Sequence, residues 1–258
     1  MKTLLVGDTH LMCGLILSFV STVIKKRDVK RVILMGDYTD QWGCLSCPDI
    51  YKDDLRLLYD WKVAQEQQGI HVILLAGNHD VPYLINEKVY YSLANQQGFQ
   101  WVKEILLSLK LQIAYQLDDY LVSHAGYTED YEPEAWHFES LLAQHLYDLK
   151  VLHEQAGISR GGRFKTGSPI WADFNRDLAV NPNLNHLKQI VGHTPVRKIE
   201  TAKQTIPIDT FSLDRAHFPI GDGSMLLYNE GNFQVIENPT WVYEEISAYF
   251  RKYIPLNG

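Results

Sequence analysis

Cysteine is scarce in this sequence of 258 residues, which contains only Cys13, Cys44 and Cys47. An odd, low cysteine count without a secretory signal is typical of a reducing compartment, so we expect a cytoplasmic protein. Cys44 and Cys47 form a C-x-x-C pair, but a zinc site would usually need a second pair, which the sequence lacks. We therefore interpret these cysteines as ordinary loop thiols.

Long apolar runs and an excess of basic residues are also missing. No apolar run reaches the length needed to cross a membrane, so we expect no membrane partner. The chain has 24 Lys and Arg against 31 Asp and Glu, a net charge of −7, which argues against a nucleic-acid partner. Phosphate chemistry stays open, because a bound metal can supply positive charge locally. The oligomeric state also stays open.

Apolar runs and amphipathic segments alternate in the first third of the chain. Residues 2–6, 31–35 and 71–76 are nearly continuous apolar runs, and residues 15–26 and 51–68 between them have helical spacing. Buried parallel strands have such unbroken apolar sequences, with helices as their connections. The pattern predicts a βαβαβ arrangement.

Shorter elements follow in the rest of the chain. We expect a strand at 120–123, a long helix over 138–155 and a C-terminal helix within 241–258. Short apolar runs at 189–191, 205–209, 224–228 and 232–237 predict a second, more antiparallel sheet. Because no clear linker interrupts the chain, we predict that residues 1–258 form a single α/β domain.

Metal-capable side chains follow five of the predicted strands, each at its carboxyl end. These side chains are Asp8, His10, Asp37, Asn78, His79, Asp80, His124 and His193. In an α/β sheet the carboxyl ends of the strands lie along one edge, where ligand sites form. A single D-x-H or G-N-H is a weak signal, but five such motifs in order after apolar strands indicate one shared site.

The donor atoms of this set are oxygen and nitrogen without thiolate, which favours Mn²⁺, Fe or Zn²⁺ over a structural zinc site. There are more candidate ligands than one ordinary metal site needs, and one bridging aspartate would let two ions use them all. Two metals roughly 3.5–4 Å apart form a clamp for in-line displacement at phosphorus. The motifs therefore predict phosphate chemistry.

The same motifs resemble those of the calcineurin-like metallophosphoesterase family. The family pattern reads GD-x-H, GD-x-x-D, GNH-[DE], H and GH. It is present here as Gly7–His10, Gly36–Asp40, Gly77–Asp80, His124 and Gly192–His193. The resemblance extends from Gly7 to about Asp209. It implies an α/β fold in which two mixed β-sheets pack as a sandwich flanked by helices, with a binuclear metal centre.

The resemblance also implies a role for each matching position. It implies ligands of the first metal at Asp8 and His10, a bridging carboxylate at Asp37, and ligands of the second metal at Asn78, His124 and His193. It implies a non-ligand histidine beside the leaving group at His79, oriented by Asp80. For Asp40 we expect a supporting hydrogen bond or a role in turning the loop rather than direct metal contact.

Finer features resemble one branch of the family. Many members have a second histidine two residues after the GH, but this sequence has Pro195 there. The segments "SHAG", "GHTP", "GSPIWADF" and "PIDT" are similar to those of serine/threonine protein phosphatases and bis(5′-nucleosyl)-tetraphosphatases. That branch usually continues GD-x-x-D with an arginine that holds the substrate phosphate and a glycine, where this chain has Gln41 and Trp42.

The phosphate-binding arginine therefore needs a substitute. A glycine-rich basic loop at 159–169 and the segment after it supply candidates, which are Arg160, Arg163, Lys165 and Arg176.

We thus expect hydrolysis of phosphate esters, either phosphomonoesters or phosphoproteins, by in-line attack of a hydroxide that bridges two divalent metals, with Mn²⁺ favoured and Fe or Zn²⁺ as alternatives. His79 would protonate the leaving oxygen. Two alternatives stay open. One is a dinucleoside polyphosphate hydrolase acting on nucleotides, and the other is a non-catalytic scaffold, although a scaffold would be expected to have lost ligands.

Overall fold

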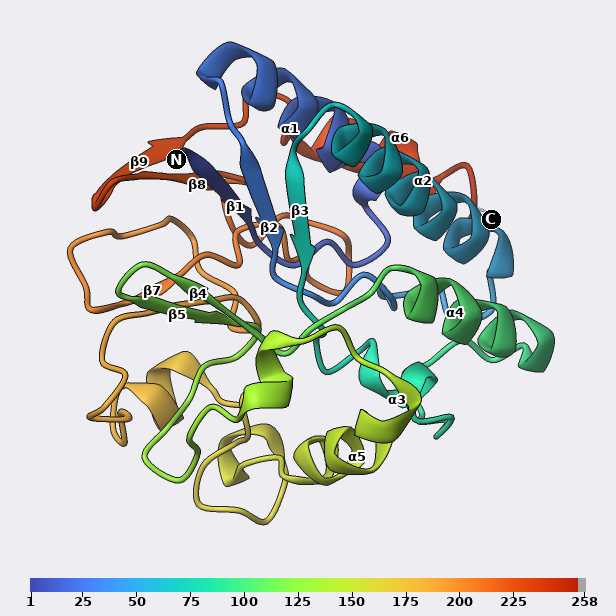
Figure 1. The fold of residues 1–258 in the computed structure, drawn as a ribbon. Helices are drawn as coiled ribbons and strands as arrows, with labels where there is room; N and C mark the ends of the chain where they lie inside the picture. Colours follow the sequence, from blue (N-terminus) through green and yellow to red (C-terminus); the bar gives the residue numbers. More distant parts are fainter. Residues whose placement is uncertain (255–258) are drawn as a thin grey trace.

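The computed structural model describes residues 1–254, and within them the strands form two sheets, one of five strands and one of four (Figure 1). The first sheet has the order β3-β2-β1-β8-β9 and the second the order β4-β5-β6-β7. The strands of the first sheet are β1 (Thr3–Val6), β2 (Arg31–Leu34), β3 (His71–Leu74), β8 (Met225–Asn229) and β9 (Asn232–Ile236). Those of the second are β4 (Ala114–Leu117), β5 (Tyr120–Ser123), β6 (Gln189–Val191) and β7 (Thr205–Pro207).

Strand pairing makes both sheets mixed, which confirms the expected architecture. β1, β2 and β3 are parallel, as the βαβαβ pattern predicts, while β8 is antiparallel to β1 and β9 to β8. In the second sheet β5, β6 and β7 are parallel and β4 is antiparallel to β5. The prediction that the four late runs form a second, more antiparallel sheet is wrong, because β6 and β7 are parallel strands of the second sheet and β8 and β9 join the first. The sequence of so short a strand shows which of its side chains are apolar, but it does not determine which neighbouring strand it pairs with.

Alternate side chains of the first sheet face two different layers. Leu4 and Val6 of β1 pack into the cluster that contains the helices, whereas Leu5 packs between the sheets together with Ile33 and Ile73 of the neighbouring strands. The second sheet's contributions to this inner layer include Leu117, Val122, Ile190 and Ile206. Since successive side chains of a strand point to opposite faces, β1, β2 and β3 are buried on both sides, which explains their nearly unbroken apolar sequences.

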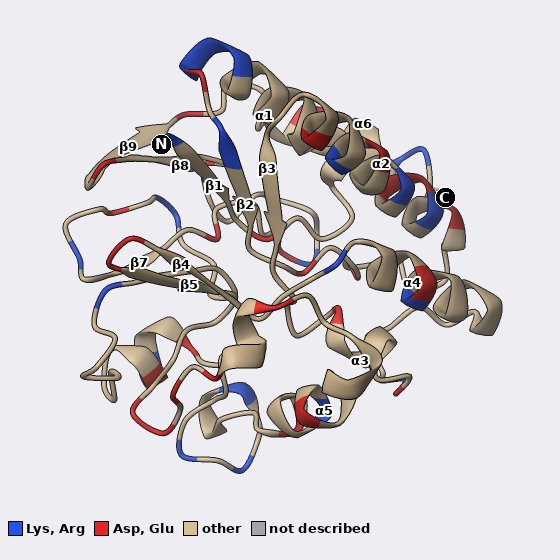
Figure 2. Cartoon of the chain, viewed as in Figure 1, with Lys and Arg blue, Asp and Glu red and all other residues tan. Residues whose placement is uncertain are grey.

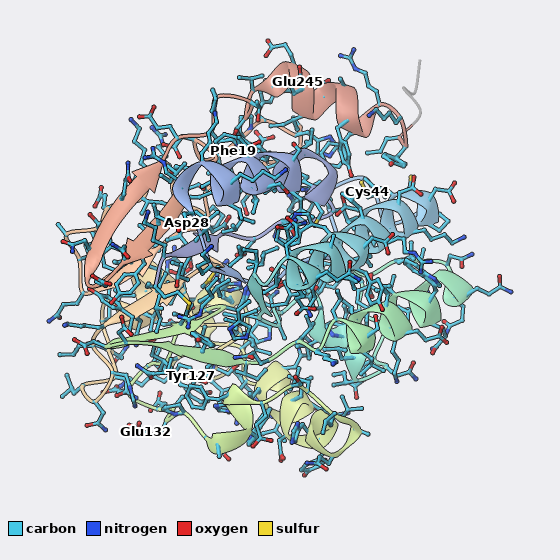
Figure 3. All side chains as sticks on the ribbon, turned by 45° about the horizontal axis from the view of Figure 1, so that its top comes forward. Phe19, Asp28, Cys44, Tyr127, Glu132 and Glu245 are labelled. Carbon is cyan, nitrogen blue, oxygen red and sulfur yellow. The ribbon has the colours of Figure 1, made fainter. Side chains whose placement is uncertain are left out.

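Helices cover the outer face of the first sheet. α1 (Cys13–Arg27) lies beside both α2 (Pro48–Gln67) and α6 (Tyr243–Phe250), as seen in Figure 3, where Phe19 marks α1 and Glu245 marks α6. α4 (Gln96–Ser108) packs on α2, and α3 (Val81–Leu84) contacts both α4 and α5 (Leu146–Glu154). The sequence did not lead us to expect α4 or β4. The Asn95 side chain, which accepts a hydrogen bond from the Gly98 N–H, is a recognisable start signal for α4.

The predicted helix over 138–155 is correct only in its second half, where α5 spans Leu146–Glu154. Before it the chain forms two short 3-10 helices, at Ala135–Phe138 and Ala143–His145. Leu142, an apolar residue inside the predicted helix, is extended and exposed. Its neighbour Leu141 is buried, and its N–H donates to the Leu111 carbonyl, so tertiary contacts override the helical spacing here.

The C-terminal helix is present but shorter than predicted, since α6 spans Tyr243–Phe250 of the expected 241–258. The last part of that prediction, residues 255–258, lies outside the described residues. Among residues 1–254, no helix is both long and apolar enough to cross a membrane. Figure 2 shows charged residues of both signs mainly on helices and loops, while the strands have few, in keeping with sheets buried on both faces.

One buried carboxylate joins the three outer helices. α1 has no capping side chain of its own, and Asp54 of α2 accepts hydrogen bonds from the backbone N–H groups of Cys13 (3.0 Å) and Gly14 (2.9 Å). The Tyr249 hydroxyl of α6 donates to the same carboxylate at 2.7 Å. Asp54 thus satisfies the open start of α1, which follows directly after the D-x-H loop.

We predict that Asp54→Ala lowers the free energy of unfolding by about 2–4 kcal/mol, because it leaves two helix-start N–H groups and a buried hydroxyl without an acceptor. Urea unfolding of the full chain measures this loss. Asp60→Ala, an exposed change on the same helix, is the matched control and should cost no more than about 0.5 kcal/mol. Equal losses in the two variants would contradict the role given to Asp54.

Candidate metal centre

The predicted site residues come from both sheets and meet where the sheets' strand ends converge. The loops after β1, β2 and β3 carry Asp8, Asp37 and Asn78, and those after β5 and β6 carry His124 and His193. The sequence predicted one shared sheet edge, but the structure uses the carboxyl ends of parallel strands in two sheets. The sandwich therefore brings together residues separated by as many as 185 positions.

Strained backbone marks these loops. His10, Asp37, Asp40 and His193 all have positive φ angles, between 39° and 61°, in the left-handed region that side chains with a Cβ rarely adopt. Such conformations cost on the order of 1 kcal/mol or more each and persist where surrounding contacts impose them, often at functional sites. Gly77 is required for a different reason, since a Cβ there would lie 2.0 Å from Asp37 Oδ1.

The first group of ligand atoms comes from Asp8, His10 and Asp37, whose candidate atoms all lie within 4.8 Å of one another. The His10 Nδ1–H donates to the Asp40 carbonyl at 2.9 Å, which leaves Nε2 with its lone pair 3.7 Å from Asp37 Oδ2. Asp8 Oδ2 accepts a hydrogen bond from the His193 N–H at 2.9 Å. The other oxygen, Asp8 Oδ1, is buried and has no hydrogen-bond partner among residues 1–254.

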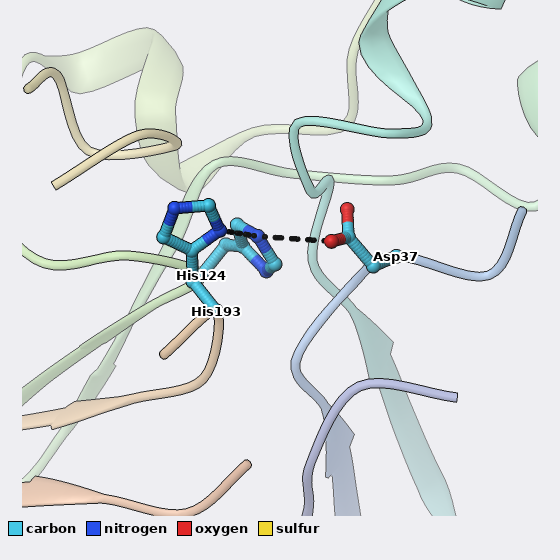
Figure 4. Close-up of side chains that lie close together, drawn as sticks. All are labelled: Asp37, His124 and His193. Carbon is cyan, nitrogen blue, oxygen red and sulfur yellow. Dashed lines mark hydrogen bonds and ion pairs between the residues drawn. The ribbon is translucent and has the colours of Figure 1, made fainter. Parts of the chain in front are cut away.

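The second group consists of Asp37, Asn78, His124 and His193, three of which are drawn in Figure 4. The His124 Nδ1–H donates to the Met35 carbonyl at 2.8 Å, so its Nε2 also presents a lone pair. That nitrogen lies 3.1 Å from Asn78 Oδ1, 3.2 Å from His193 Nδ1 and 3.5 Å from Asp37 Oδ2. Four electron-rich atoms therefore converge on one point, and Asp37 belongs to both groups.

The protonation preferences of these groups suit cation binding. Burial lowers the pKa of both His124 and His193, which keeps the imidazoles neutral and their lone pairs free. Burial raises the pKa of Asp8, and the neighbouring Asp209 and Asp37 carboxylates raise it further. Burial would raise the pKa of Asp37 too, but the surrounding histidines hold it below its ordinary value. A divalent cation would give the unpaired Asp8 oxygen a partner and would accept the lone pairs that converge at His124 Nε2. The donor atoms therefore fit a divalent cation.

His79 lies beside this cluster without joining it. Its Nδ1 faces Asp40 Oδ2 at 3.2 Å, and the other Asp40 oxygen accepts hydrogen bonds from the Tyr51 hydroxyl (2.7 Å) and the Tyr83 hydroxyl (2.5 Å). Burial alone would lower the pKa of His79, but the carboxylates of Asp37 and Asp40 raise it to about 9. The role expected for Asp40, a supporting hydrogen bond, agrees with these contacts.

Asp80 differs from its expected role of orienting His79. Its carboxylate accepts hydrogen bonds from the backbone N–H groups of Gly77 (3.0 Å), Asp37 (2.8 Å) and Tyr38 (2.9 Å). Asp80 therefore fixes the loop that carries Asp37, and Asp40 takes the position beside the His79 ring. Adjacent residues leave the backbone in different directions, and here only the more distant acid faces the imidazole.

The four basic candidates occupy different environments. Arg160 lines the cavity at the site, and its guanidinium donates to Thr194 Oγ1 (2.9 Å) and pairs with Asp173 Oδ2 (3.1 Å). The other three are exposed and do not line the cavity: Arg163 lies over the Phe164 ring, Lys165 pairs with Glu129, and Arg176 is at the surface.

Asp209 is a buried acid beside the cluster that the motifs did not place there. It follows β7, and Ser212 donates to it through both its hydroxyl (2.8 Å) and its N–H (3.2 Å). Burial raises the pKa of Asp209 to about 6, against the opposing effect of His10. Like the predicted ligands, Asp209 lies at the carboxyl end of a short apolar run, and this position was the signal available in the sequence.

A cavity of about 450 Å³ opens onto the cluster, a size typical of small-molecule sites. Its floor includes His10, Asp37, Asn78 and His193. Its walls are largely aromatic and aliphatic, and the aromatic members are Trp42, Tyr90, Tyr91 and Trp171. The adjacent residues Trp42 and Gln41, which replace the branch's usual glycine and arginine, both line this cavity.

Comparisons with solved structures support the fold. The chain is 15% identical to a point mutant of a cold-active protein tyrosine phosphatase, with a TM-score of 0.61 over 95% of this chain and 78% of that one. The cold-active protein-tyrosine phosphatase of a psychrophilic Shewanella is 16% identical, with a TM-score of 0.57 over the same shares. A serine/threonine phosphatase from Saccharomyces cerevisiae with similarity to human PP5 is 16% identical, with a TM-score of 0.51 over 92% and 81%.

No curated protein sequence matches the chain. The family model described as calcineurin-like phosphoesterase, however, matches residues 1–202, which include all five motifs. This match covers well over half of the sequence and agrees with the mixed-sheet sandwich and its buried cluster of acids and imidazoles. The chain therefore belongs to the calcineurin-like phosphoesterase family and is a metal-dependent phosphoesterase.

Proposed function

We propose that this protein hydrolyses phosphate monoesters at a centre of two divalent cations that share the Asp37 carboxylate. The observation that carries this proposal is the position of Asp37, whose Oδ2 faces His10 Nε2 on one side (3.7 Å) and His124 Nε2 on the other (3.5 Å). Asp8 and His10 would complete one cation's ligands, and Asn78, His124 and His193 the other's. The mixed oxygen and nitrogen donors favour Mn²⁺, with Fe and Zn²⁺ as alternatives.

Two cations held in this way would supply an activated water nucleophile and neutralise charge on the phosphoryl oxygens. The chain itself would supply the proton. With Nδ1–H donated to Asp40, the Nε2 atom of His79 is free to donate to the departing oxygen. Asp40, which the Tyr51 and Tyr83 hydroxyls hold in place, orients the His79 ring for this donation.

Arg160 is our candidate for the missing phosphate-binding arginine. It is half-buried at the cavity, and its Nε is buried without a hydrogen-bond partner among residues 1–254. Asp173 and Thr194 hold the end of the guanidinium close to His193. Burial lowers the pKa of His193, and the positive charge of Arg160 lowers it further. A guanidinium held in this way matches the geometry of phosphate oxygens.

We predict that a chelator abolishes hydrolysis of p-nitrophenyl phosphate and that Mn²⁺ restores it best among Mn²⁺, Zn²⁺ and Mg²⁺. Metal analysis of the active protein should find close to two ions per chain, because the two ligand groups share one carboxylate. Full activity in the metal-free protein, or a single ion at full activity, would refute the binuclear proposal.

We predict that Arg160→Ala lowers kcat/KM for p-nitrophenyl phosphate by roughly 10- to 100-fold, the effect of losing a charged hydrogen bond to phosphate. Arg163→Ala on the same loop is the matched control and should change kcat/KM by no more than about twofold. Melting temperatures of both variants would separate a binding defect from a folding defect. If the two variants behave alike, Arg160 does not hold the phosphate.

We predict that His79→Asn keeps both metals but slows hydrolysis of an alkyl phosphate by roughly 10²- to 10⁴-fold, the usual contribution of a general acid. The loss should be much smaller for p-nitrophenyl phosphate, whose leaving group departs without a proton. His71→Asn, an exposed change at the start of β3, should leave both rates unaltered. Metal loss in the His79 variant would instead make His79 a ligand, and a rate loss independent of the leaving group would make its role structural.

A further inference from the structure

Aromatic side chains surround the cavity on the side of the proposed proton donor. The ring of Tyr91 lies 4.8 Å from that of His79, and the Tyr90 ring lies 4.9 Å from Tyr91. Tyr90 is 92% exposed and Trp42 is 49% exposed, although both line the cavity. Large aromatic residues exposed together at a cavity mouth mark a binding surface rather than a core.

Trp42 is held in position by a segment that lies beyond the part of the chain matching the family model. The His217 ring donates from Nε2 to the Trp42 carbonyl at 2.7 Å, and the Arg215 guanidinium lies 5.1 Å from the centre of the Trp42 ring. His217 in turn stacks on Phe250 of α6 at 4.4 Å. Trp42, which stands where the branch usually has a glycine, is therefore held by contacts with residues 215–217.

The positions of Trp42, Tyr90 and Tyr91 relative to the expected phosphate site indicate which part of a substrate they would contact. Arg160 lies close to His193, one of the proposed ligands, where the phosphate would bind. The His79 side is where a leaving group would depart, since His79 would protonate the leaving oxygen. An aromatic group directly attached to that oxygen would meet Tyr91 and then the rim formed by Tyr90 and Trp42. A nucleotide base would lie farther away, separated from the phosphorus by its ribose.

We propose that this cavity selects aryl phosphate monoesters, whose ring packs against the aromatic rim defined by Trp42, Tyr90 and Tyr91. The proposal rests on the phosphomonoesterase function proposed above. Offset and edge-to-face packing of rings stabilises aromatic pairs beyond simple area burial, so the rim discriminates a flat ring from an aliphatic group of the same size.

Binding of two inert phosphonates tests this selectivity without the complication that aryl groups are better leaving groups. Benzylphosphonate and cyclohexylmethylphosphonate have the same charge and nearly the same size, and only the first is aromatic. Calorimetry with the Mn²⁺-loaded full chain should show that benzylphosphonate binds roughly 3- to 10-fold more tightly than cyclohexylmethylphosphonate. Trp42→Leu and Tyr90→Leu should each lower this ratio of affinities toward one.

Tyr147→Leu is the matched control, because Tyr147 is an exposed tyrosine on α5 that does not line the cavity, and it should preserve the ratio. Equal affinities in the unaltered protein would show that the rim is merely apolar and would overturn the proposal. Tighter binding of adenosine 5′-monophosphate than of benzylphosphonate would overturn it in favour of a nucleotide. Unchanged ratios in both rim variants would also overturn it.

The same preparations separate this inference from the proposed function. Hydrolysis of p-nitrophenyl phosphate together with equal phosphonate affinities refutes only the aryl selectivity. Selective binding of benzylphosphonate without hydrolysis of any ester refutes the phosphatase function and leaves the selectivity standing. Competition between free phosphotyrosine and a phosphotyrosine peptide then distinguishes a small aryl ester from a polypeptide, and preference for either one over the matching phosphoserine compound supports the inference.

Discussion

The rest of the structure depends on a concentration of buried acids and imidazoles between the two sheets. Asp8, Asp37 and Asp209 are each almost fully buried within reach of one another's charge, and three ligand atoms surround His124 Nε2 within 3.5 Å. Burying charge is costly unless it is paired, and convergent lone pairs repel. A cation is the natural partner of such a group, because it pairs with the buried carboxylates and accepts the lone pairs of the imidazoles.

Hydrogen bonds between loops hold the ligands in their strained conformations. Asp80 accepts from the backbone of the loop after β2 and so holds Asp37 at a φ of 53°. In the same way the carbonyl of Asp40 fixes the His10 ring, and the carboxylate of Asp40 contacts His79. The loop after β2 thus supports the proposed ligands Asp37 and His10 and the proposed acid His79, so we expect changes in this loop to affect all three residues together.

Two parts of the chain contribute differently to the cavity. The ligand floor comes from segments within residues 1–202, which match the family, whereas Ser212, Leu213 and Ile220 of the wall lie beyond them. That later segment also fixes Trp42 through His217 and connects to α6. The later segment therefore adds wall residues and positions Trp42, while the proposed ligands and the rim residues Trp42, Tyr90 and Tyr91 all lie within residues 1–202.

The sequence by itself determined the types of candidate ligand, their order along the chain and their positions after apolar strands, because continuous apolar runs and short polar turns are local properties. It also indicated the parallel β1–β3 unit for the same reason. Only the tertiary structure decided that two sheets rather than one supply the strand ends, that Asp40 rather than Asp80 faces His79, and that Arg160 alone of the four basic candidates lines the cavity in residues 1–254. Each of these depends on contacts between segments tens of residues apart, and such contacts follow from strand register and layer packing, which no local pattern encodes.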